Sequence, residues 1–126
     1  MKRLLIVDDE RDIVDLYSEF FKMVGLSDIT YASDGIEAFV LCTQHEYDII
    51  TLDHEMPFMK GADFLKAIRN KENKNTKTTV MMISAFIPEI ENSLKNYENT
   101  FFFDKPVDLE KLARYIKMMP DKKTEK

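Results

Sequence analysis

Residues 48–61, DIITLDHEMPFMKG, join a short apolar run to a carboxylate and then to a tight loop. The run of Ile49, Ile50, Thr51 and Leu52 is typical of a buried strand, and it stops at Asp53. The proline and glycine that follow favour a loop before the next element. Because α/β sheets place their chemistry at the carboxyl ends of such strands, Asp53 is the first candidate functional residue.

On either side of this stretch, short apolar runs alternate with segments of helical periodicity. The predicted strands are residues 4–7, 29–32, 48–53, 79–83 and 101–103. The predicted helices are residues 10–24, a segment opened by 33–35 and capped by Asp34, residues 61–70, residues 88–97, and a segment capped by Asp108 and stopped by Pro120. The alternation predicts an α/β fold, in which a five-stranded parallel sheet has helices on both faces.

The spacing of apolar residues also predicts which side of each helix packs inward. For the first helix the inward set is Ile13, Leu16, Tyr17, Phe20, Phe21 and Val24. For the second it is Ile36, Phe39, Val40 and Thr43, and for the third it is Phe64, Leu65 and Ile68. The last helix is expected to pack through Leu109, Leu112, Ala113 and Ile116.

The polar segments are expected at the surface. Residues 71–77 are rich in asparagine and lysine and predict an exposed loop. We expect one domain over residues 1–120 and a frayed polar tail over 121–126. His45 and His54 are expected to be surface residues, and Cys42 to pack inside a helix interface.

Composition narrows the function classes. The 126 residues suffice for one domain, and 44% hydrophobic with 33% charged residues is typical of a globular protein. The net charge of −5 argues against nucleic acid as a partner of this chain alone. The single cysteine excludes an intrachain disulfide. The first predicted strand leaves no room for a signal peptide, and no apolar run approaches the ~20 residues of a membrane helix, so we expect a cytoplasmic protein without membrane insertion.

The carboxyl ends of four predicted strands carry polar side chains. These are Asp8, Asp9, Asp53, Ser84 and Lys105. Each alone also fits a turn carboxylate, a solvated lysine or an ordinary serine, but parallel strands bring all of them to one edge of the sheet. Three carboxylates without histidine or cysteine favour Mg²⁺ or Mn²⁺. A metal, a lysine and a hydroxyl together suit a phosphoryl group, with Asp53 as the attacking nucleophile.

At this point the chain resembles the response-regulator receiver domain of two-component signal transduction. The resemblance covers nearly the whole chain, through LLIVDDE (4–10), LDHEMPFMKG (52–61), ISA (83–85) and FFFDKP (101–106). It implies a flavodoxin-like, doubly wound (βα)5 fold with strand order 2-1-3-4-5. It also implies a phosphoprotein that receives its phosphoryl group from a sensor histidine kinase or a phosphotransfer protein.

The resemblance assigns roles to individual residues. Asp53 would be the phospho-acceptor, and Asp8, Asp9, Asp53 and the backbone carbonyl of Glu55 would bind Mg²⁺. Ser84 and Lys105 would contact phosphoryl oxygens. Ser84 and Phe102 would form the switch that changes a protein-binding face of the fourth helix, fifth strand and fifth helix. The Lys105–Pro106 peptide bond is expected to be cis. No output domain follows Lys126, which fits either a stand-alone receiver, similar to chemotaxis response regulators, or a shortened chain.

Two other function classes stay open on the sequence. Glu55 lies two residues after Asp53, a spacing used by phosphohydrolases that form an aspartyl-phosphate. A pseudo-receiver that binds proteins without being phosphorylated is the other alternative. If the chain is a receiver domain, it is expected to catalyse only its own phosphorylation and dephosphorylation. It is therefore not expected to be an enzyme that acts on other molecules. Phe86 and Glu55 are expected to set the aspartyl-phosphate lifetime by controlling the access of water.

Overall fold

The computed structural model describes residues 2–87, 94 and 97–122. Its strands are β1 (Arg3–Val7), β2 (Asp28–Ala32), β3 (Ile49–Asp53), β4 (Thr79–Ser84) and β5 (Thr100–Asp104). Its helices are α1 (Arg11–Met23), α2 (Gly35–Gln44), α3 (Gly61–Asn70) and α5 (Leu109–Met118). The expected fourth helix, residues 88–97, falls almost entirely outside the described residues.

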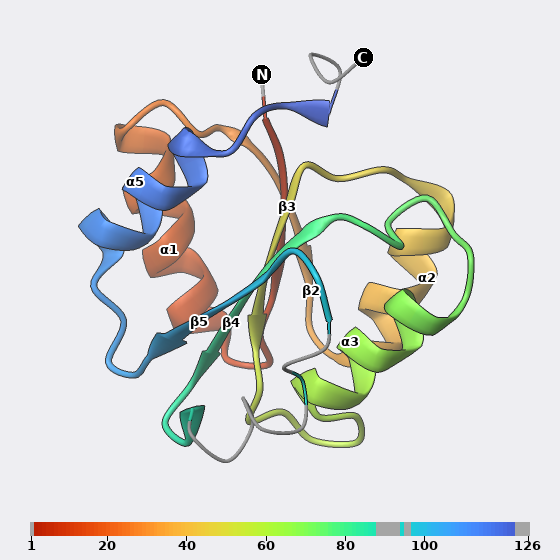
Figure 1. Cartoon of the computed structure of the whole chain (residues 1–126). Coiled ribbons are helices and arrows are strands. Elements are labelled where there is room, and N and C mark those ends of the chain that lie inside the picture. The colour runs from red at the N-terminus through yellow and green to blue at the C-terminus, as the bar shows by residue number, and fades with distance from the viewer. Residues whose placement is uncertain (1, 88–93, 95–96, 123–126) are drawn as a thin grey trace.

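The five strands form one parallel sheet in the order β2-β1-β3-β4-β5, which confirms the predicted fold class and strand order. Figure 1 shows α1 and α5 on one face of the sheet and α2 and α3 on the other. All five residues of β3 are buried because this strand lies at the centre, between β1 and β4. Parallel pairing places the end of every strand on the same edge, so Asp53 lies beside Ile83 and Ser84 beside Asp104.

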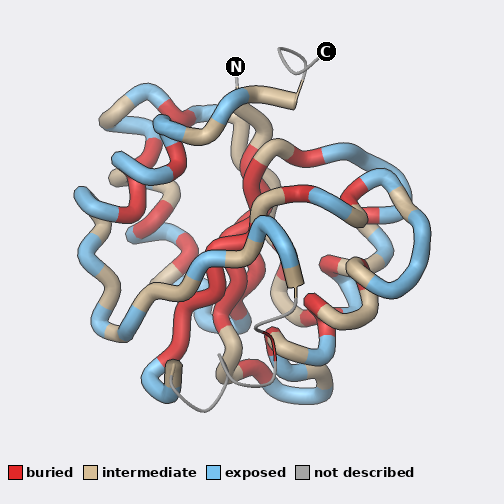
Figure 2. The backbone as a smooth tube through the Cα atoms, viewed as in Figure 1, coloured by how far each residue is buried: buried red, intermediate tan, exposed pale blue. Residues whose placement is uncertain are grey.

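The core has two halves, one on each side of the sheet, and buried residues follow the strands through the middle of the molecule in Figure 2. Alternating residues of each strand enter opposite halves, so that Leu5 and Leu52 pack toward α2 and α3 while Leu4 and Ile49 pack toward α1 and α5. Continuous apolar runs in the sequence reflect this burial on both faces.

The predicted inward face of α1 is largely confirmed, and that of α2 is wrong. In α1 the buried residues are Val14, Tyr17 and Phe21, and Leu16 is 51% exposed. Ile13, Phe20 and Val24 are half-buried and pack against the same core, so five of the six predicted residues face inward as expected. The buried stripe follows the 3-and-4 spacing from Val14 through Tyr17 to Phe21, so the prediction missed Val14 and wrongly included Leu16.

In α2 the buried residues are Gly35, Ala38 and Cys42, so the inward face is made of small side chains. Ile36, Val40 and Thr43 are exposed instead, and only Phe39 of the predicted set packs against the core. Small residues let α2 lie close to its neighbours, and Met59 occupies the space directly above Gly35. Cys42 is buried as expected, and burial raises the pKa of its thiol to about 12.

The predicted caps and the other helix faces are confirmed. Asp34 accepts a hydrogen bond from the Glu37 amide, and Asp108 accepts one from the Lys111 amide. Phe64, Leu65 and Ile68 of α3 and Leu112, Ala113 and Ile116 of α5 are buried. Leu109 is half-buried beside the same core.

The loop of residues 71–77 is not simply a solvated segment. Asn75 is fully buried within it, and its side-chain amide bonds to the backbone of Tyr47, Cys42 and His45. The polar composition of this loop therefore reflects internal hydrogen bonding as well as exposure, which the sequence pattern did not distinguish.

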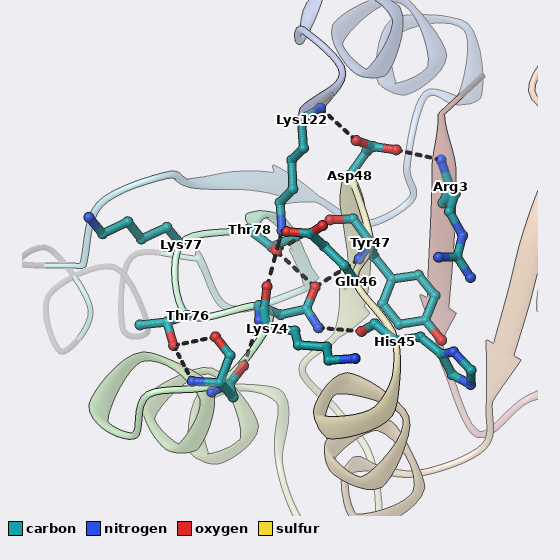
Figure 3. A network of polar contacts seen from close by, with 12 residues as sticks. Arg3, His45, Glu46, Tyr47, Asp48, Lys74, Thr76, Lys77, Thr78 and Lys122 are labelled. Carbon is teal, nitrogen blue, oxygen red and sulfur yellow. Dashed lines mark hydrogen bonds and ion pairs between the residues drawn. The ribbon is translucent and has the colours of Figure 1, made fainter. Parts of the chain in front are cut away.

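The start of the expected tail is docked and not frayed. The Lys122 amide donates to Asp48 Oδ1 at 2.8 Å, and the Arg3 amide donates to Asp48 Oδ2 at 2.8 Å. Figure 3 shows the Lys122 side chain reaching toward Thr78 and Glu46, and its ammonium bonds to the Thr78 hydroxyl and lies 3.4 Å from the Glu46 carboxylate. Lys2 and Asp121 form a further ion pair at 2.6 Å. Residues 123–126 lie outside the described part of the chain.

Candidate phosphorylation site

Three aspartates meet at the carboxyl edge of the sheet. Asp8 follows β1, Asp9 follows Asp8, and Asp53 ends β3. Each offers one carboxylate oxygen, and these oxygens lie within 4.8 Å of one another. Asp8 and Asp53 are only 5% and 3% exposed, whereas Asp9 is exposed. The structure thus brings together the three carboxylates that the sequence placed at this edge.

The electrostatics of the cluster are unfavourable without a cation. Burial, with the charge of Asp53 as a smaller cause, raises the pKa of Asp8 to about 6, although a hydrogen bond from the Glu10 amide opposes the shift. Burial also raises the pKa of Asp53, although the Lys105 ammonium opposes it. Oxygen ligands crowded at this distance fit a hard divalent cation such as Mg²⁺, which would relieve the repulsion.

Lys105 supplies the positive charge of the site. Its Nζ lies 2.7 Å from Asp53 Oδ1 and 3.2 Å from Glu55 Oε1. Burial alone would lower the pKa of Lys105, but the hydrogen bond and charge of Asp53 outweigh it and the pKa is raised. The Lys105 amide also donates to the Ser84 carbonyl, which ties the end of β5 to the end of β4. The Lys105–Pro106 bond is cis, as expected.

The side chains of Ser84 and Glu55 form a hydrogen bond. The fully buried Ser84 donates its hydroxyl to Glu55 Oε2 at 2.6 Å and accepts the Phe86 amide at 3.0 Å. The Ala85 amide donates to Glu55 Oε1 at 3.1 Å. Burial would raise the pKa of Glu55, but the hydrogen bonds from Ser84, Ala85 and Lys105 together lower it.

Sequence reasoning missed this role of the Glu55 carboxylate and the Ala85 amide. The resemblance placed only the backbone carbonyl of Glu55 in the site. The available signal was the position of an acidic side chain two residues after Asp53, close enough to reach the donors at the end of the neighbouring strand. The Glu55 amide itself donates to Asp53 Oδ1 at 3.1 Å, which holds the two residues together.

His54 is not a free surface residue, contrary to the prediction. It is half-buried, and its Nδ1 accepts a hydrogen bond from the Ala62 amide at 3.1 Å. The Gly61 amide donates to the His54 carbonyl at 3.1 Å. Residue 54 therefore satisfies donors at the start of α3 and anchors the loop that begins with Asp53. His45 is exposed, as predicted.

Replacing Gly61 with alanine is expected to destabilise the fold. A Cβ at this position would lie 2.8 Å from His54 Cα and 2.9 Å from the Asp53 carbonyl oxygen, so backbone atoms would have to move. We expect a loss of about 1–3 kcal/mol in the free energy of unfolding, as for other overpacked positions. Urea denaturation measures the change.

Ala62→Gly is the matched control for that substitution, because it alters the next residue without adding atoms. It is expected to cost about 1 kcal/mol from helix propensity alone. A Gly61→Ala protein as stable as the wild type would contradict the close approach of α3 to the β3 end.

An apolar groove of about 460 Å³ opens beside the carboxylates, between α1 and the segment that follows β5. It is lined by Asp8, Glu10, Ile13, Leu16, Tyr17, Asp53, Lys105, Pro106, Val107 and Leu109. The exposed Leu16 is thus part of a wall next to the candidate nucleophile.

Phe102, the predicted switch residue, is half-buried on β5 and packs against the core half that contains α2 and α3. Phe86 is 56% exposed just beyond Ser84.

Comparison with known proteins supports one family. The sequence-family model of the response regulator receiver domain matches residues 4–117. The chain is 31% identical over 114 residues to a Bacillus subtilis (strain 168) protein named uncharacterized transcriptional regulatory protein YcbL, a match that covers 90% of this chain and 48% of that one. It is 35% identical over 81 residues to a probable chemotaxis protein CheY of Rhizobium etli, covering 64% and 61% of the two chains.

Solved structures give the same result. The chemotaxis protein CheY4 of Vibrio cholerae superposes with a TM-score of 0.83 at 28% identity, covering 95% of this chain and 99% of that one. The receiver domain of the Francisella response regulator 1452 superposes with a TM-score of 0.82 at 28% identity, covering 94% and 96%.

The chain spans about half the length of the first curated relatives it matches. No helix in the described residues combines the length and apolar character needed to cross a membrane. The family model matches residues 4–117, and both the sheet order and the polar residues at the ends of β1, β3, β4 and β5 agree with this assignment. This chain belongs to the response regulator receiver domain family of two-component systems.

Proposed function

We propose that Asp53 accepts a phosphoryl group from a phosphohistidine of a sensor histidine kinase or phosphotransfer protein. The observation that carries this proposal is the Lys105 ammonium 2.7 Å from the buried Asp53 carboxylate, beside two further aspartates. In the transfer, an Asp53 carboxylate oxygen forms a bond to phosphorus while the bond from phosphorus to the histidine nitrogen breaks. The electron pair stays on that nitrogen, which takes up a proton, and an acyl phosphate remains on Asp53.

Receiver domains typically bind Mg²⁺ at an acidic pocket, and the donor set here suits that ion. Asp8, Asp9, Asp53 and the backbone carbonyl of Glu55 would hold it, and the ion would neutralise charge on the phosphoryl oxygens. Lys105 pairs with one phosphoryl oxygen, and the Ser84 hydroxyl donates to another. Receiver domains are generally non-enzymatic signalling domains, and we limit the chemistry of this chain to its own phosphorylation and dephosphorylation.

The output is a change in a protein-binding face. When Ser84 moves to bind the phosphoryl group, Phe102 turns inward behind it, and the face that includes β5 and α5 binds an unidentified protein target. Phe102 has no hydroxyl, so packing alone stabilises its inward position. The size of this population shift is limited by how much better the phosphoryl group fits the active arrangement than the inactive one.

The test is incubation with acetyl phosphate or phosphoramidate and Mg²⁺, followed by intact-protein mass spectrometry. We expect a single phosphoryl adduct on the wild type, none on Asp53→Asn, and none when a chelator removes the divalent cation. Asp12→Asn, which changes an exposed aspartate of α1, is the matched control and should be modified like the wild type. An equal adduct on Asp53→Asn would refute the assignment, and turnover of a phosphoester substrate would favour a phosphohydrolase instead.

A further inference from the structure

The Glu55 carboxylate binds a set of donors at the ends of β4 and β5, next to the candidate phosphorylation site. Its Oε2 accepts the Ser84 hydroxyl at 2.6 Å, and its Oε1 accepts the Ala85 amide at 3.1 Å. The same Oε1 lies 3.2 Å from Lys105 Nζ, which also contacts Asp53. A side-chain anion therefore already satisfies groups from the ends of β4 and β5 that surround Asp53.

These donors cannot all serve two anions at once. A serine hydroxyl has one hydrogen and a backbone amide has one, so each can donate to Glu55 or to a phosphoryl oxygen. Only the Lys105 ammonium, with three hydrogens, can be shared. In addition, a carboxylate next to a phosphoryl group would repel it, because both carry negative charge.

The Glu55 side chain can turn outward into solvent. Its side chain is 30% exposed, so moving it outward returns a charged group to water and does not bury one. The backbone carbonyl of the same residue, which is the part assigned to the cation site, need not move when the side chain rotates. An incoming anion must replace the charge of the Glu55 carboxylate and its three contacts.

We propose that the Glu55 carboxylate is an internal competitor that occupies the phosphoryl-binding donors of the unphosphorylated site and is displaced when Asp53 is modified. This proposal rests on the proposed function, since it takes Asp53 as the phospho-acceptor. It makes Glu55 a specificity and positioning residue whose side chain weakens the binding of phosphoryl-like anions. Removing the competitor should strengthen that binding.

The probe is beryllofluoride, a non-covalent phosphoryl mimic, titrated at saturating Mg²⁺ and followed by calorimetry. We expect Glu55→Gln to bind it about tenfold more tightly than the wild type, equivalent to one charge-assisted hydrogen bond no longer in competition. Glu55→Ala should give at least the same gain. Glu10→Gln is the matched control, because Glu10 is exposed and lines the adjacent groove, and its replacement removes the same charge without touching Ser84, Ala85 or Lys105.

The Ala85 amide gives a second measurement that a purely structural role of Glu55 would not reproduce. In the wild type its proton resonance should change little on beryllofluoride binding, since one anion replaces another. In Glu55→Ala it should start at a position typical of a free amide and shift toward the wild-type position on binding.

The outcomes separate the two proposals. Absence of binding to the wild type and to the Glu55 variants alike, or binding that persists in Asp53→Asn, would overturn the phospho-acceptor and the competitor together. Binding that requires Asp53 but is equal or weaker in Glu55→Gln would overturn the competitor alone. A gain of equal size in Glu10→Gln would show a general charge effect and would also overturn it.

Discussion

Lys105→Met is expected to slow phosphorylation of Asp53 by small phosphodonors about 10²- to 10³-fold, the usual effect of losing one positioned donor to a transition-state oxyanion. Methionine keeps the length and volume of the side chain but removes the ammonium that lies 2.7 Å from Asp53. No other lysine or arginine among the described residues is within ion-pair distance of Asp53. The measurement is the rate of adduct formation with phosphoramidate, followed by intact mass.

The same variant should bind Mg²⁺ at least as tightly as the wild type. Lys105 and a divalent cation both neutralise Asp53, so removing one favours the other. A protein that is slow to react yet binds the cation well is folded, and its defect is specific to the phosphoryl group. Lys117→Met, at an exposed position of α5, should leave both properties unchanged. A Lys105→Met protein that reacts at the wild-type rate would remove Lys105 from the site.

The sequence was sufficient for the architecture and for most of the candidate site. Continuous apolar runs such as residues 4–7 are typical of strands buried on both faces, and their alternation with helical segments predicts a parallel sheet. Once the sheet is parallel, the residues that follow each run must share one edge. Asp8, Asp53, Ser84 and Lys105 could therefore be brought together without any knowledge of the tertiary structure.

Side-chain direction was harder to predict than position. The α2 prediction chose the larger residues Ile36 and Val40, whereas the close approach of Met59 selects the small face with Gly35 and Ala38. Likewise, the resemblance assigned the backbone carbonyl of Glu55 to the cation site but gave its carboxylate no contact there. Which way Glu55 turns depends on donors at the end of β4, and no local pattern around residue 55 records them.

Polar residues that bond internally were mistaken for solvated ones. Asn75 and Lys122 belong to segments whose composition is typical of exposed chain, and both make their contacts with partners far away in sequence. A single sequence does not reveal such pairs, because asparagine and lysine are usually exposed. These contacts stabilise the edge of the sheet opposite the carboxylates.

Asn75→Ala is expected to lower the free energy of unfolding by about 3–5 kcal/mol. Asn75 Oδ1 accepts from the Tyr47 amide and the Thr78 hydroxyl, each at 2.9 Å. Its Nδ2 donates to the Cys42 and His45 carbonyls at 2.8 and 2.7 Å. Because the residue is fully buried, alanine leaves a backbone amide and carbonyls without partners, each at a cost of about 1–3 kcal/mol. Urea denaturation measures the loss.

Asn70→Ala is the control, since Asn70 is exposed and its side chain makes one hydrogen bond within the described residues, to the Tyr97 hydroxyl. It should change the free energy of unfolding by no more than about 0.5 kcal/mol. A loss below about 1 kcal/mol for Asn75→Ala would mean that water replaces the amide and that the loop is not packed as described.

Asn75→Asp provides a pH test of the same contacts. It keeps Oδ1 but turns a carboxylate oxygen toward the Cys42 and His45 carbonyls, where only a protonated carboxyl can donate. Burial and these carbonyls raise the pKa of the new carboxyl in the folded state above its unfolded value of about 4, against the opposing charge of the Lys122 ammonium, which bonds to the neighbouring Thr78 hydroxyl. The folded state then holds the proton longer than the unfolded state, so the stability of Asn75→Asp should be highest below that unfolded pKa and fall as the pH rises through the folded one. A pH profile parallel to that of the wild type would place the residue 75 side chain in solvent.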